Sequence, residues 1–339
     1  MDAIDFMLVN ALEISPRASW ASLESVLDAD ATTLARRWKR LVDLGLTWSG
    51  CYFATTTAAG VVLTGTLAFV EVDCVAGERE SVIESISRAP HVISIECTSG
   101  SRELILTLGS MSVAEVDRYV STELAVVPGV RATRTHFTRR FFKEGGDWRL
   151  DVLPDRKLRM LQRLETQAGA GVEIPDAPSP LHRRVIEALA SDARRSASSV
   201  ATEIGRSVAT TARAITQVTH ADWAMSRIDF AHSRVGFGAS TLLWFSVPHL
   251  QVEAVGVGLG LMKEVRMCCS VIGRSNLVAS LWMRDLGEFE SIERRIATVF
   301  PSARLDDRWM IMRTPKRVGH LLDADHRHSG FVPFVQTQR

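Results

Sequence analysis

Apolar residues in the first 45 positions recur at helical spacing in three short runs. Ser15-Pro16 ends the first predicted helix, residues 3–13, and Ser19 is placed to cap the second. Asp30 caps a third helix over residues 31–44, and Gly45 follows it. This order predicts a helix-turn-helix, whose last helix would enter the major groove of DNA. The residues expected on the buried faces are Ile4, Leu8, Ala11, Leu12, Trp20, Leu23, Val26, Leu27, Leu34, Trp38 and Leu41.

The pattern returns once along the chain, so the sequence predicts an internal duplication. In the helical part the two copies align at an offset of 177 residues, and further along the offset becomes 173. The offset changes by four residues, so the first copy is four residues longer than the second between about Leu46 and Gly65. A length change of this kind indicates a loop or linker. At the first offset Arg17 falls on Arg194, Thr33 on Thr210 and Arg36 on Arg213; at the second, Gly100 falls on Gly273 and Pro128 on Pro301.

The second module of each copy alternates strand-like and helix-like segments in the order β-α-β-β-α-β. This is the ferredoxin-like arrangement, in which helices cover one face of the sheet and the other face is available to a second such sheet. The expected elements are residues 66–73, 77–87, 91–98, 103–108, 112–125 and 130–142 in the first copy. In the second copy they are 241–247, 251–261, 265–272, 277–283, 286–299 and 304–313.

We therefore expect an α+β chain in which winged helix-turn-helix domains alternate with ferredoxin-like βαββαβ sensor domains, two copies per chain. The expected boundaries are 1–60 for the first helix-turn-helix domain, 61–150 for the first sensor domain, and 151–179 for a helix (154–167) and a flexible Pro/Gly-rich linker. They are followed by a second helix-turn-helix domain over 180–236, a second sensor domain over 237–323 and a poorly ordered tail over 324–339. In that tail His326 and His328 are expected to be solvated.

Composition narrows the class of protein further. Hydrophobic residues are 46% and charged residues 23%, which is an ordinary globular balance, and a net charge of +1 means that any basic surface must be local. Five cysteines without a C-x-x-C pair argue against a disulfide framework and a zinc site, and Cys268-Cys269 in a predicted strand should be buried. Without a signal sequence or a long apolar run, we expect a cytoplasmic protein with no membrane segment, metal or cofactor.

Polar residues on the remaining faces of the third helix of each copy are the candidates for DNA contact. The basic run RRWKR of the first copy could neutralise phosphates, or it could be a solvated helix face. In the second copy Ala214 and Thr216 replace Arg37 and Lys39, so that helix either reads DNA differently or has become structural; both interpretations stay open. The candidates are Thr32, Thr33, Arg36, Arg37, Lys39 and Arg40, then Ser207, Thr210, Thr211, Arg213 and Gln217.

These features together resemble the Lrp/AsnC family, the feast/famine regulators. The matching elements in residues 1–46 are Asp5, Ala11-Leu12, Arg17, and the close formed by Arg37, Leu41 and Gly45. The family's serine before the reading helix is Asp30 here and Ser207 in the second copy, and residues 227–237, RIDFAHSRVGF, resemble the family's β-wing and linker. The sensor halves resemble its ligand-binding RAM domain, whose hairpin Gly and Asp, three residues apart, correspond to Gly100–Glu103 and Gly273–Asn276.

The resemblance implies that a small effector, typically an amino acid, binds near this hairpin where two sensor domains pair. Arg102 or Arg274 could then hold a ligand carboxylate in bidentate fashion, although a polar hairpin tip with Gly100 at positive φ explains the same residues. Most family members carry one unit, so this chain could contain within itself the pairing that usually forms between subunits. The candidate effector residues are Ser99, Gly100, Ser101, Arg102, Glu103, Gly273, Arg274, Ser275 and Asn276.

The expected function is therefore a sequence-specific transcription regulator, not an enzyme, with double-stranded DNA, a small effector and further copies of the chain (a dimer or larger) as partners. Sirohaem decarboxylases share the layout but carry a His-x-Tyr-x-Arg type stretch at the hairpin. The corresponding stretches here, ISIECTSGSRELILTL and MCCSVIGRSNLVASLW, lack His and Tyr. The weakly basic second reading helix also allows a third function, a metabolite-sensing module without DNA activity.

Overall fold

The computed structural model describes residues 1–54, 65–100 and 102–334. The chain divides into two compact units, and each unit combines segments from both halves of the sequence. Unit 1 comprises Met1–Ala59 and Arg149–Ala231, and unit 2 comprises Gly60–Trp148 and His232–Arg339. The two copies of each module therefore pack against one another, helical module with helical module and sheet module with sheet module.

Unit 1 consists of two helix-turn-helix modules and a connecting helix. A side chain caps the N-terminus of every helix of the two modules, because Asp2, Ser19, Asp30, Ser179, Ser196 and Ser207 each accept a hydrogen bond from a backbone N–H in the first turn. The first module contains α1 (Ala3–Ile14), α2 (Trp20–Leu27), α3 (Ala31–Asp43) and β1 (Thr47–Phe53). The second contains α7 (Pro180–Leu189), α8 (Ala197–Ile204), α9 (Val208–His220) and β6 (Ala224–Phe230); α6 (Asp155–Gly169) precedes it.

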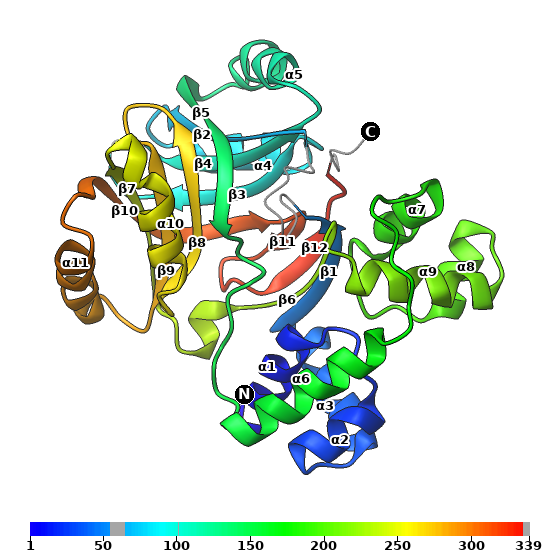
Figure 1. Cartoon of the computed structure of the whole chain (residues 1–339). Helices are drawn as coiled ribbons and strands as arrows, with labels where there is room; N and C mark the ends of the chain where they lie inside the picture. Colours follow the sequence, from blue (N-terminus) through cyan, green and yellow to red (C-terminus); the bar gives the residue numbers. More distant parts are fainter. Residues whose placement is uncertain (55–64, 101, 335–339) are drawn as a thin grey trace. The chain divides into compact units, whose positions relative to one another are not determined.

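The single strands of the two modules form one antiparallel ladder (Figure 1). Its register places Gly50 opposite Arg227, and these two positions are equivalent at the 177-residue offset. A residue that faces its own counterpart lies on a two-fold axis, so the two modules are related by pseudo-two-fold symmetry. The wing expected from the sequence is thus a shared sheet with one strand from each copy.

A reciprocal pair of arginines joins the same two modules. Arg17 donates to the carbonyl oxygens of Ala193 and Arg195, the latter at 2.9 Å. Its counterpart Arg194 donates to the carbonyl oxygens of Pro16 at 2.5 Å and Ala18 at 3.1 Å. The donors and acceptors exchange under the 177-residue offset, as an isologous interface requires. We call these four hydrogen bonds the arginine clasp.

The start of α6 is anchored to α1 by two buried polar side chains. Asn10 Oδ1 accepts from the backbone N–H groups of Val152 and Leu153, and Glu13 Oε2 accepts from that of Leu150 at 3.0 Å. Asn10 also donates to Glu13 at 3.0 Å. Burial raises the pKa of Glu13 to about 8, although these hydrogen bonds oppose the rise.

We expect the stability of unit 1 to fall as pH rises from about 5 to 8. An unfolded glutamate ionises near its ordinary value of 4.5, whereas the buried Glu13 keeps its proton until about pH 8, so the folded state binds the extra proton between these values. Glu13→Gln keeps an oxygen acceptor for Leu150 and removes the titration. Chemical denaturation at pH 5 and pH 8 measures the effect, and a pH dependence of equal size in the variant would contradict it.

Unit 2 contains two βαββαβ modules. Their order matches the sequence-based prediction, except that the second helix of the first copy is a short α-helix continued by a π-helical turn, Tyr119–Leu124. The first copy has β2 (Thr66–Cys74), α4 (Arg79–Ser87), β3 (Val92–Thr98), β4 (Leu104–Ser110), α5 (Val113–Arg118) and β5 (Val130–Lys143). The second has β7 (Ala239–Ser246), α10 (Val252–Gly260), β8 (Val265–Ile272), β9 (Leu277–Met283), α11 (Gly287–Val299) and β10 (Arg304–Arg317).

The strands of both copies close into one eight-stranded antiparallel sheet. Its order is β10-β3-β4-β2-β5-β8-β9-β7, and β7 pairs again with β10. The last strand of each copy lies between the two modules. β5 pairs with β2 of its own copy and with β8 of the second copy, and β10 pairs with β7 of its own copy and with β3 of the first. The expected pairing of two sensor sheets is therefore confirmed within a single chain.

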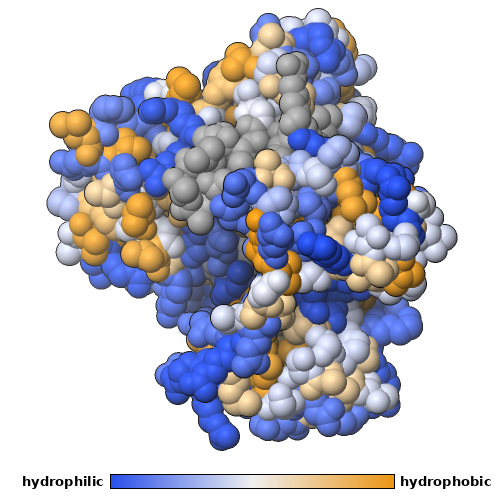
Figure 2. Space-filling model, turned by 45° about the vertical axis from the view of Figure 1, so that its right-hand side comes forward, coloured by the Kyte–Doolittle hydropathy of each residue, from blue (hydrophilic) through white to orange (hydrophobic). Residues whose placement is uncertain are grey.

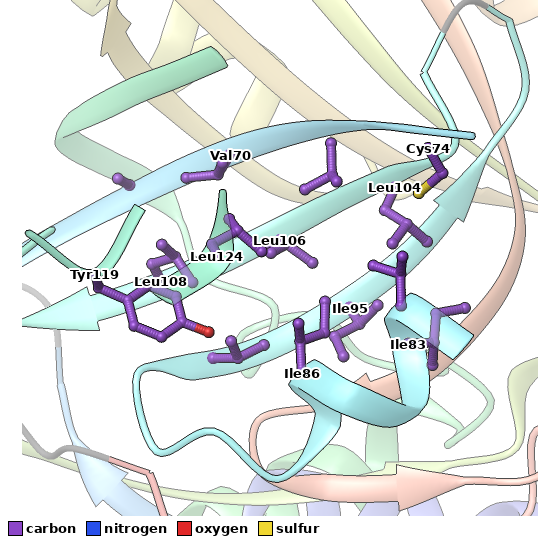
Figure 3. Close-up of a cluster of buried hydrophobic side chains, with 14 of the residues drawn as sticks. Val70, Cys74, Ile83, Ile86, Ile95, Leu104, Leu106, Leu108, Tyr119 and Leu124 are labelled. Carbon is purple, nitrogen blue, oxygen red and sulfur yellow. The ribbon is translucent and has the colours of Figure 1, made fainter. Parts of the chain in front are cut away.

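The described residues of unit 2 form three apolar cores. Two lie between the sheet and the helices of each copy, and Figure 3 shows one of them, where Ile83 and Ile86 of α4 point toward Ile95 and Leu104. The third lies inside the closed sheet and includes Trp244 and Trp309. Alternation along β8 sends Cys268 to a helix-covered core and Cys269 to the interior, so both are buried, as predicted.

The C-terminal residues differ from the expectation of a poorly ordered tail. The strands β11 (His320–Leu322) and β12 (His328–Phe331) pair with one another, and β11 also pairs with β10. His326 stacks on His232 with ring centroids 4.9 Å apart, and His328 lies 3.1 Å from His320. The prediction that both tail histidines are solvated is wrong, because aromatic and imidazole partners elsewhere in unit 2 partly bury them.

The face drawn in Figure 2 mixes hydrophilic side chains with small separate hydrophobic groups. Among the described residues, no helix is long and apolar enough to cross a membrane.

Candidate nucleic-acid interface and effector site

Most of the basic run on α3 is paired with carboxylates of the protein itself. Arg37 and Arg40 reach Asp5 on α1 at 2.9 and 2.6 Å, and Arg37 also pairs with Asp2 at 2.7 Å. The exposed Lys39 pairs with Asp43, one turn away on the same helix. Asp5 is only 1% exposed, so these two arginines stabilise a buried charge and hold α3 against α1.

The first copy therefore keeps a small free surface at the N-terminal half of α3. Thr32 and Arg36 are exposed and Thr33 is half-buried. In the part of the chain that the structure describes, Arg36 forms no ion pair. Hydrogen bonding with Thr33 lowers the pKa of the capping Asp30 carboxyl, which remains charged beside this surface.

The second copy replaces the ionic link between its first and third helices by a neutral one. His182 stands where the first copy has Asp5, and Gln217 stands where it has Arg40. His182 Nε2 lies 3.0 Å from Gln217 Oε1, and the Gln217 amide donates to the Glu173 carbonyl oxygen at 2.8 Å. Gln217 is thus fixed inside unit 1 instead of extending from the reading helix.

The exposed end of α9 is nevertheless equivalent to that of α3. Ser207 caps the helix through the Thr210 N–H at 3.1 Å, and both are exposed, whereas Thr211 is fully buried at the position of Leu34. Arg213, the counterpart of Arg36, is exposed, and no ion pair to it is found among the described residues. The sequence of α9 is less basic than that of α3. Even so, each reading helix has one exposed arginine, Arg36 or Arg213, that forms no ion pair among the described residues.

The two sensor hairpins use part of their polar residues to hold the fold. Ser99 exchanges two hydrogen bonds with the Met310 backbone on β10, at 2.9 and 3.0 Å, and Gly100 is exposed with φ +95°. Ser101 lies outside the described residues. Ser275 donates to Asp306 at 2.8 Å, and Arg274 is exposed at the tip of the second hairpin.

Glu103 and Asn276 have the same structural role in the two copies. Glu103 Oε2 accepts from the Cys74 N–H at 2.7 Å, and Asn276 Oδ1 accepts from the Val247 N–H at 2.9 Å. Cys74 and Val247 are equivalent at the 173-residue offset. Both side chains therefore satisfy the backbone at the end of the first strand, which only requires an oxygen acceptor at this hairpin position.

Five side chains of unit 2 form a cluster of charged and aromatic groups where the two sensor copies meet. Arg102 pairs with Glu71 of β2 and lies 5.4 Å from the ring centroid of Trp309 on β10. Glu71 Oε1 is 2.7 Å from His136 Nε2 of β5, and the His136 ring lies 4.8 Å from that of Trp244 on β7. We call Glu71, Arg102, His136, Trp244 and Trp309 the inter-copy cluster.

The inter-copy cluster has no symmetric duplicate, because its members occupy equivalent positions with different side chains. Trp244 is the counterpart of Glu71, and Trp309 is the counterpart of His136. Burial and the neighbouring Arg102 lower the pKa of His136, which favours the neutral imidazole. A Cβ atom on Gly273 would lie 3.0 Å from His136 Nδ1, so the second hairpin also borders this cluster.

Sequence reasoning identified Arg102 and Gly273 but missed Glu71, His136, Trp244 and Trp309. These four lie on strands far from the hairpins in sequence, and only closure of the sheet brings them together. A glutamate that interrupts the apolar strand LAFVEV is the one local signal that pointed to Glu71.

Comparison with known proteins adds family relationships to this geometry. A family model described as "Lrp/AsnC ligand binding domain" matches residues 67–148. An uncharacterised HTH-type transcriptional regulator of Pyrococcus abyssi is 30% identical over 138 residues, which are 40% of this chain and 90% of that protein. Another, from Pyrococcus horikoshii, is 22% identical over 135 residues, 40% of this chain and 84% of that protein.

A solved structure covers nearly the whole chain. The siroheme decarboxylase NirDL superposes with a TM-score of 0.56 over 93% of both chains, at 14% sequence identity. A structure of the same protein in complex with an iron-uroporphyrin III analogue gives a TM-score of 0.54 over 88% of this chain. At this identity the likeness concerns the fold, with two modules of each kind in one polypeptide.

Proposed function

The chain belongs to the Lrp/AsnC family, and we propose that it is a sequence-specific DNA-binding transcription regulator whose two reading helices act as a pair within one polypeptide. The observation that carries the proposal is the equivalence of Arg36 and Arg213. Both are exposed, neither forms an ion pair among the described residues, and they lie on modules related by the two-fold axis of the β1–β6 ladder.

The proposed DNA contact follows from the exposed ends of α3 and α9. A helix-turn-helix presents the N-terminal residues of its last helix to the major groove. Thr32, Thr33 and Thr210 offer hydroxyl groups there, and each arginine can bind a guanine edge or a phosphate. Pseudo-two-fold symmetry favours a palindromic pair of half-sites whose centres lie about 10 base pairs, one helical turn, apart or at a multiple of that spacing.

The inter-copy cluster is the proposed site for an amino-acid effector. An amino acid carries one positive and one negative group, which match Glu71 and Arg102, and an apolar side chain can pack on Trp244 or Trp309. The cluster lies at the contact between the two sensor copies, so a ligand bound there acts on their pairing. In this proposal the ligand carboxylate competes with Glu71 for the guanidinium of Arg102.

Arg102→Gln is expected to weaken the response to the effector by at least about tenfold while DNA affinity without effector stays unchanged. Glu71 keeps Arg134 at 3.6 Å and His136 at 2.7 Å in this variant, so its carboxylate remains partnered. Arg274→Gln on the exposed tip of the other hairpin is the matched control. Titration of the protein–DNA complex with effector measures both, and equal responses in the two variants would remove Arg102 from the site.

The proposal as a whole is tested by a mobility-shift titration of the full chain on DNA flanking its own gene. The titration is run at two salt concentrations, with and without each proteinogenic amino acid. We expect a shift that weakens as salt rises, because phosphate contacts release counterions, and one amino acid that changes it. Absence of any salt-sensitive shift would overturn the proposed function.

A tetrapyrrole decarboxylase is the second candidate function, favoured by the fold shared with NirDL over 93% of the chain. His136 is the only histidine of the inter-copy cluster, and the described hairpin residues include neither His nor Tyr. An absorbance band that appears when a tetrapyrrole is added, followed by release of carbon dioxide, would establish this candidate. Of these two candidates we propose the regulator before the decarboxylase. The proposal therefore includes that the protein is not an enzyme, and that several copies of the chain assemble.

A further inference from the structure

The helix α6 carries a row of three arginines that the two reading helices do not account for. Arg156, Arg159 and Arg163 are exposed, and none of them is ion-paired within the described ranges. At 100° and 1.5 Å per residue, the spacing i, i+3, i+7 places them within about 60° of one another around the helix and over about 10 Å along it. We call these residues the arginine stripe.

The opposite face of α6 packs against both helix-turn-helix modules. Near its start, Lys157 pairs at 2.8 Å with Asp28, which lies in the turn between α2 and α3. Near its end, Glu165 accepts a hydrogen bond from Ser15 and lies 3.6 Å from His220 at the end of α9. Leu161, between these points, is fully buried. The helix therefore runs from the turn of the first reader to the reading helix of the second (Figure 1).

A cavity confirms that α6 contacts the two modules together. Its volume is about 390 Å³, and its walls include Ser19 and Ser22 at the start of α2, Leu164 on α6, and Ala212 and Thr216 on α9. Because the inward face of α6 is committed to this contact, the arginine stripe on the opposite face is exposed to solvent.

We infer that the arginine stripe contacts the phosphates of the DNA that separates the two half-sites. The inference rests on the proposed function and extends it to a third contact surface. Three exposed guanidinium groups that form no ion pair among the described residues favour a polyanion. A span of about 10 Å matches about three phosphates of one strand at about 3.4 Å of helix axis per nucleotide. The pairing of Lys157 with the turn before α3 holds the start of α6, where the stripe begins, beside the first reader.

The stripe also gives the protein a direction on its operator. The helix-turn-helix occurs twice in unit 1, whereas α6 occurs once and starts beside the first copy. A symmetric pair of half-sites would therefore receive an asymmetric set of phosphate contacts. Phosphate contacts carry no base information, so the stripe adds affinity and orientation without changing the sequence that is read.

The test is the triple variant Arg156→Gln, Arg159→Gln, Arg163→Gln in the full chain. The slope of log K against log salt should fall in magnitude by about 2 to 3, since each phosphate contact contributes about 0.9. The preferred base sequence should stay the same, and a hydroxyl-radical footprint should lose protection on one side of the centre. The control variant Arg118→Gln, Arg284→Gln, Arg294→Gln removes the same charge from exposed positions of unit 2.

The outcomes separate the inference from the proposed function. If the wild-type chain binds with a salt-dependent affinity and the stripe variant keeps the wild-type slope and footprint, the inference is overturned and the proposed function stands. If both triple variants lose the same slope, general charge and not the stripe is responsible, which also overturns it. If the wild-type chain shows no salt-dependent binding, the proposed function fails, and the inference with it.

Discussion

Replacing both Arg36 and Arg213 by glutamine is expected to weaken binding to an operator by at least about 30-fold. An arginine that binds a base edge contributes about 1–3 kcal/mol, so the pair contributes about 2–6 kcal/mol, and each 1.4 kcal/mol is about a factor of ten. Both residues are exposed and unpaired among the described residues, so the substitutions leave no buried charge behind. Equilibrium titration of labelled operator DNA measures the loss.

Each single variant should show part of this loss, because the two readers contact separate half-sites. Lys39→Gln is the control within α3, since that exposed lysine pairs with Asp43 and is expected to change affinity little. A double variant that binds as tightly as the wild type would show that these helices are not the readers. A loss confined to Arg36→Gln would show that the second copy has become structural.

Removing the arginine clasp with Arg17→Met and Arg194→Met is expected to destabilise unit 1 by about 3–6 kcal/mol. Each arginine donates two hydrogen bonds to carbonyl oxygens of the other module. We count the about 1.5–3 kcal/mol of a hydrogen bond to a charged group once per guanidinium, because both bonds share one charge, which gives about 3–6 kcal/mol for the two arginines. Arg194 also lies 4.2 Å from the ring centroid of Trp20, a contact that methionine partly retains. Chemical denaturation measures the change in the free energy of unfolding.

Loss of the clasp should also affect DNA recognition, because it fixes one reader against the other. The variant should discriminate less between half-sites at the preferred spacing and half-sites moved apart by several base pairs. Arg195→Met is the matched control: its side chain donates to Ala188 and pairs with Glu203, both within the second copy. Equal destabilisation and equal discrimination in control and clasp variants would contradict a special role for the clasp.

The general architecture could be predicted because its signals are local and repeated. Helical spacing of apolar residues and N-caps such as Ser19 and Ser207 define the helices, and strand alternation defines the two βαββαβ modules. The 173-residue offset relates β2, which begins at Thr66, to β7, which begins at Ala239. In each βαββαβ module the helices cover one face of the sheet, and the other face needs a second sheet to bury it. The second copy of the module provides that sheet within the same chain.

The functional surface was harder to predict because it depends on contacts between distant residues. Arg37 and Arg40 look like phosphate ligands in the sequence, but the buried Asp5 on another helix pairs with both. Thr211 looks available on a polar helix, yet it occupies the core position of Leu34. The internal repeat aligns Arg17 with Arg194 in the sequence. The structural role of the two arginines is evident only from the carbonyl groups to which each donates across the pseudo-two-fold axis.

The inter-copy cluster and the tail illustrate the same limit for unit 2. Glu71 and His136 become neighbours through pairing of β2 with β5, and Trp244 reaches His136 only because the sheet closes. The sequence predicts solvated histidines in a tail rich in polar residues, but His326 stacks on His232 and His328 contacts His320. Patterns of period two or 3.6 residues contain no information about such partners.

If one chain places two reading helices on one pair of half-sites, the stoichiometry of the protein–DNA complex should be one chain for each pair. The mass of the complex is measured on a DNA fragment with a single palindromic operator and on a fragment in which one half-site is scrambled. The two masses give the number of chains per half-site. We expect one chain on two half-sites, and weaker binding of one chain when a half-site is lost. Two chains on one palindrome, or no complex with either DNA, would contradict it.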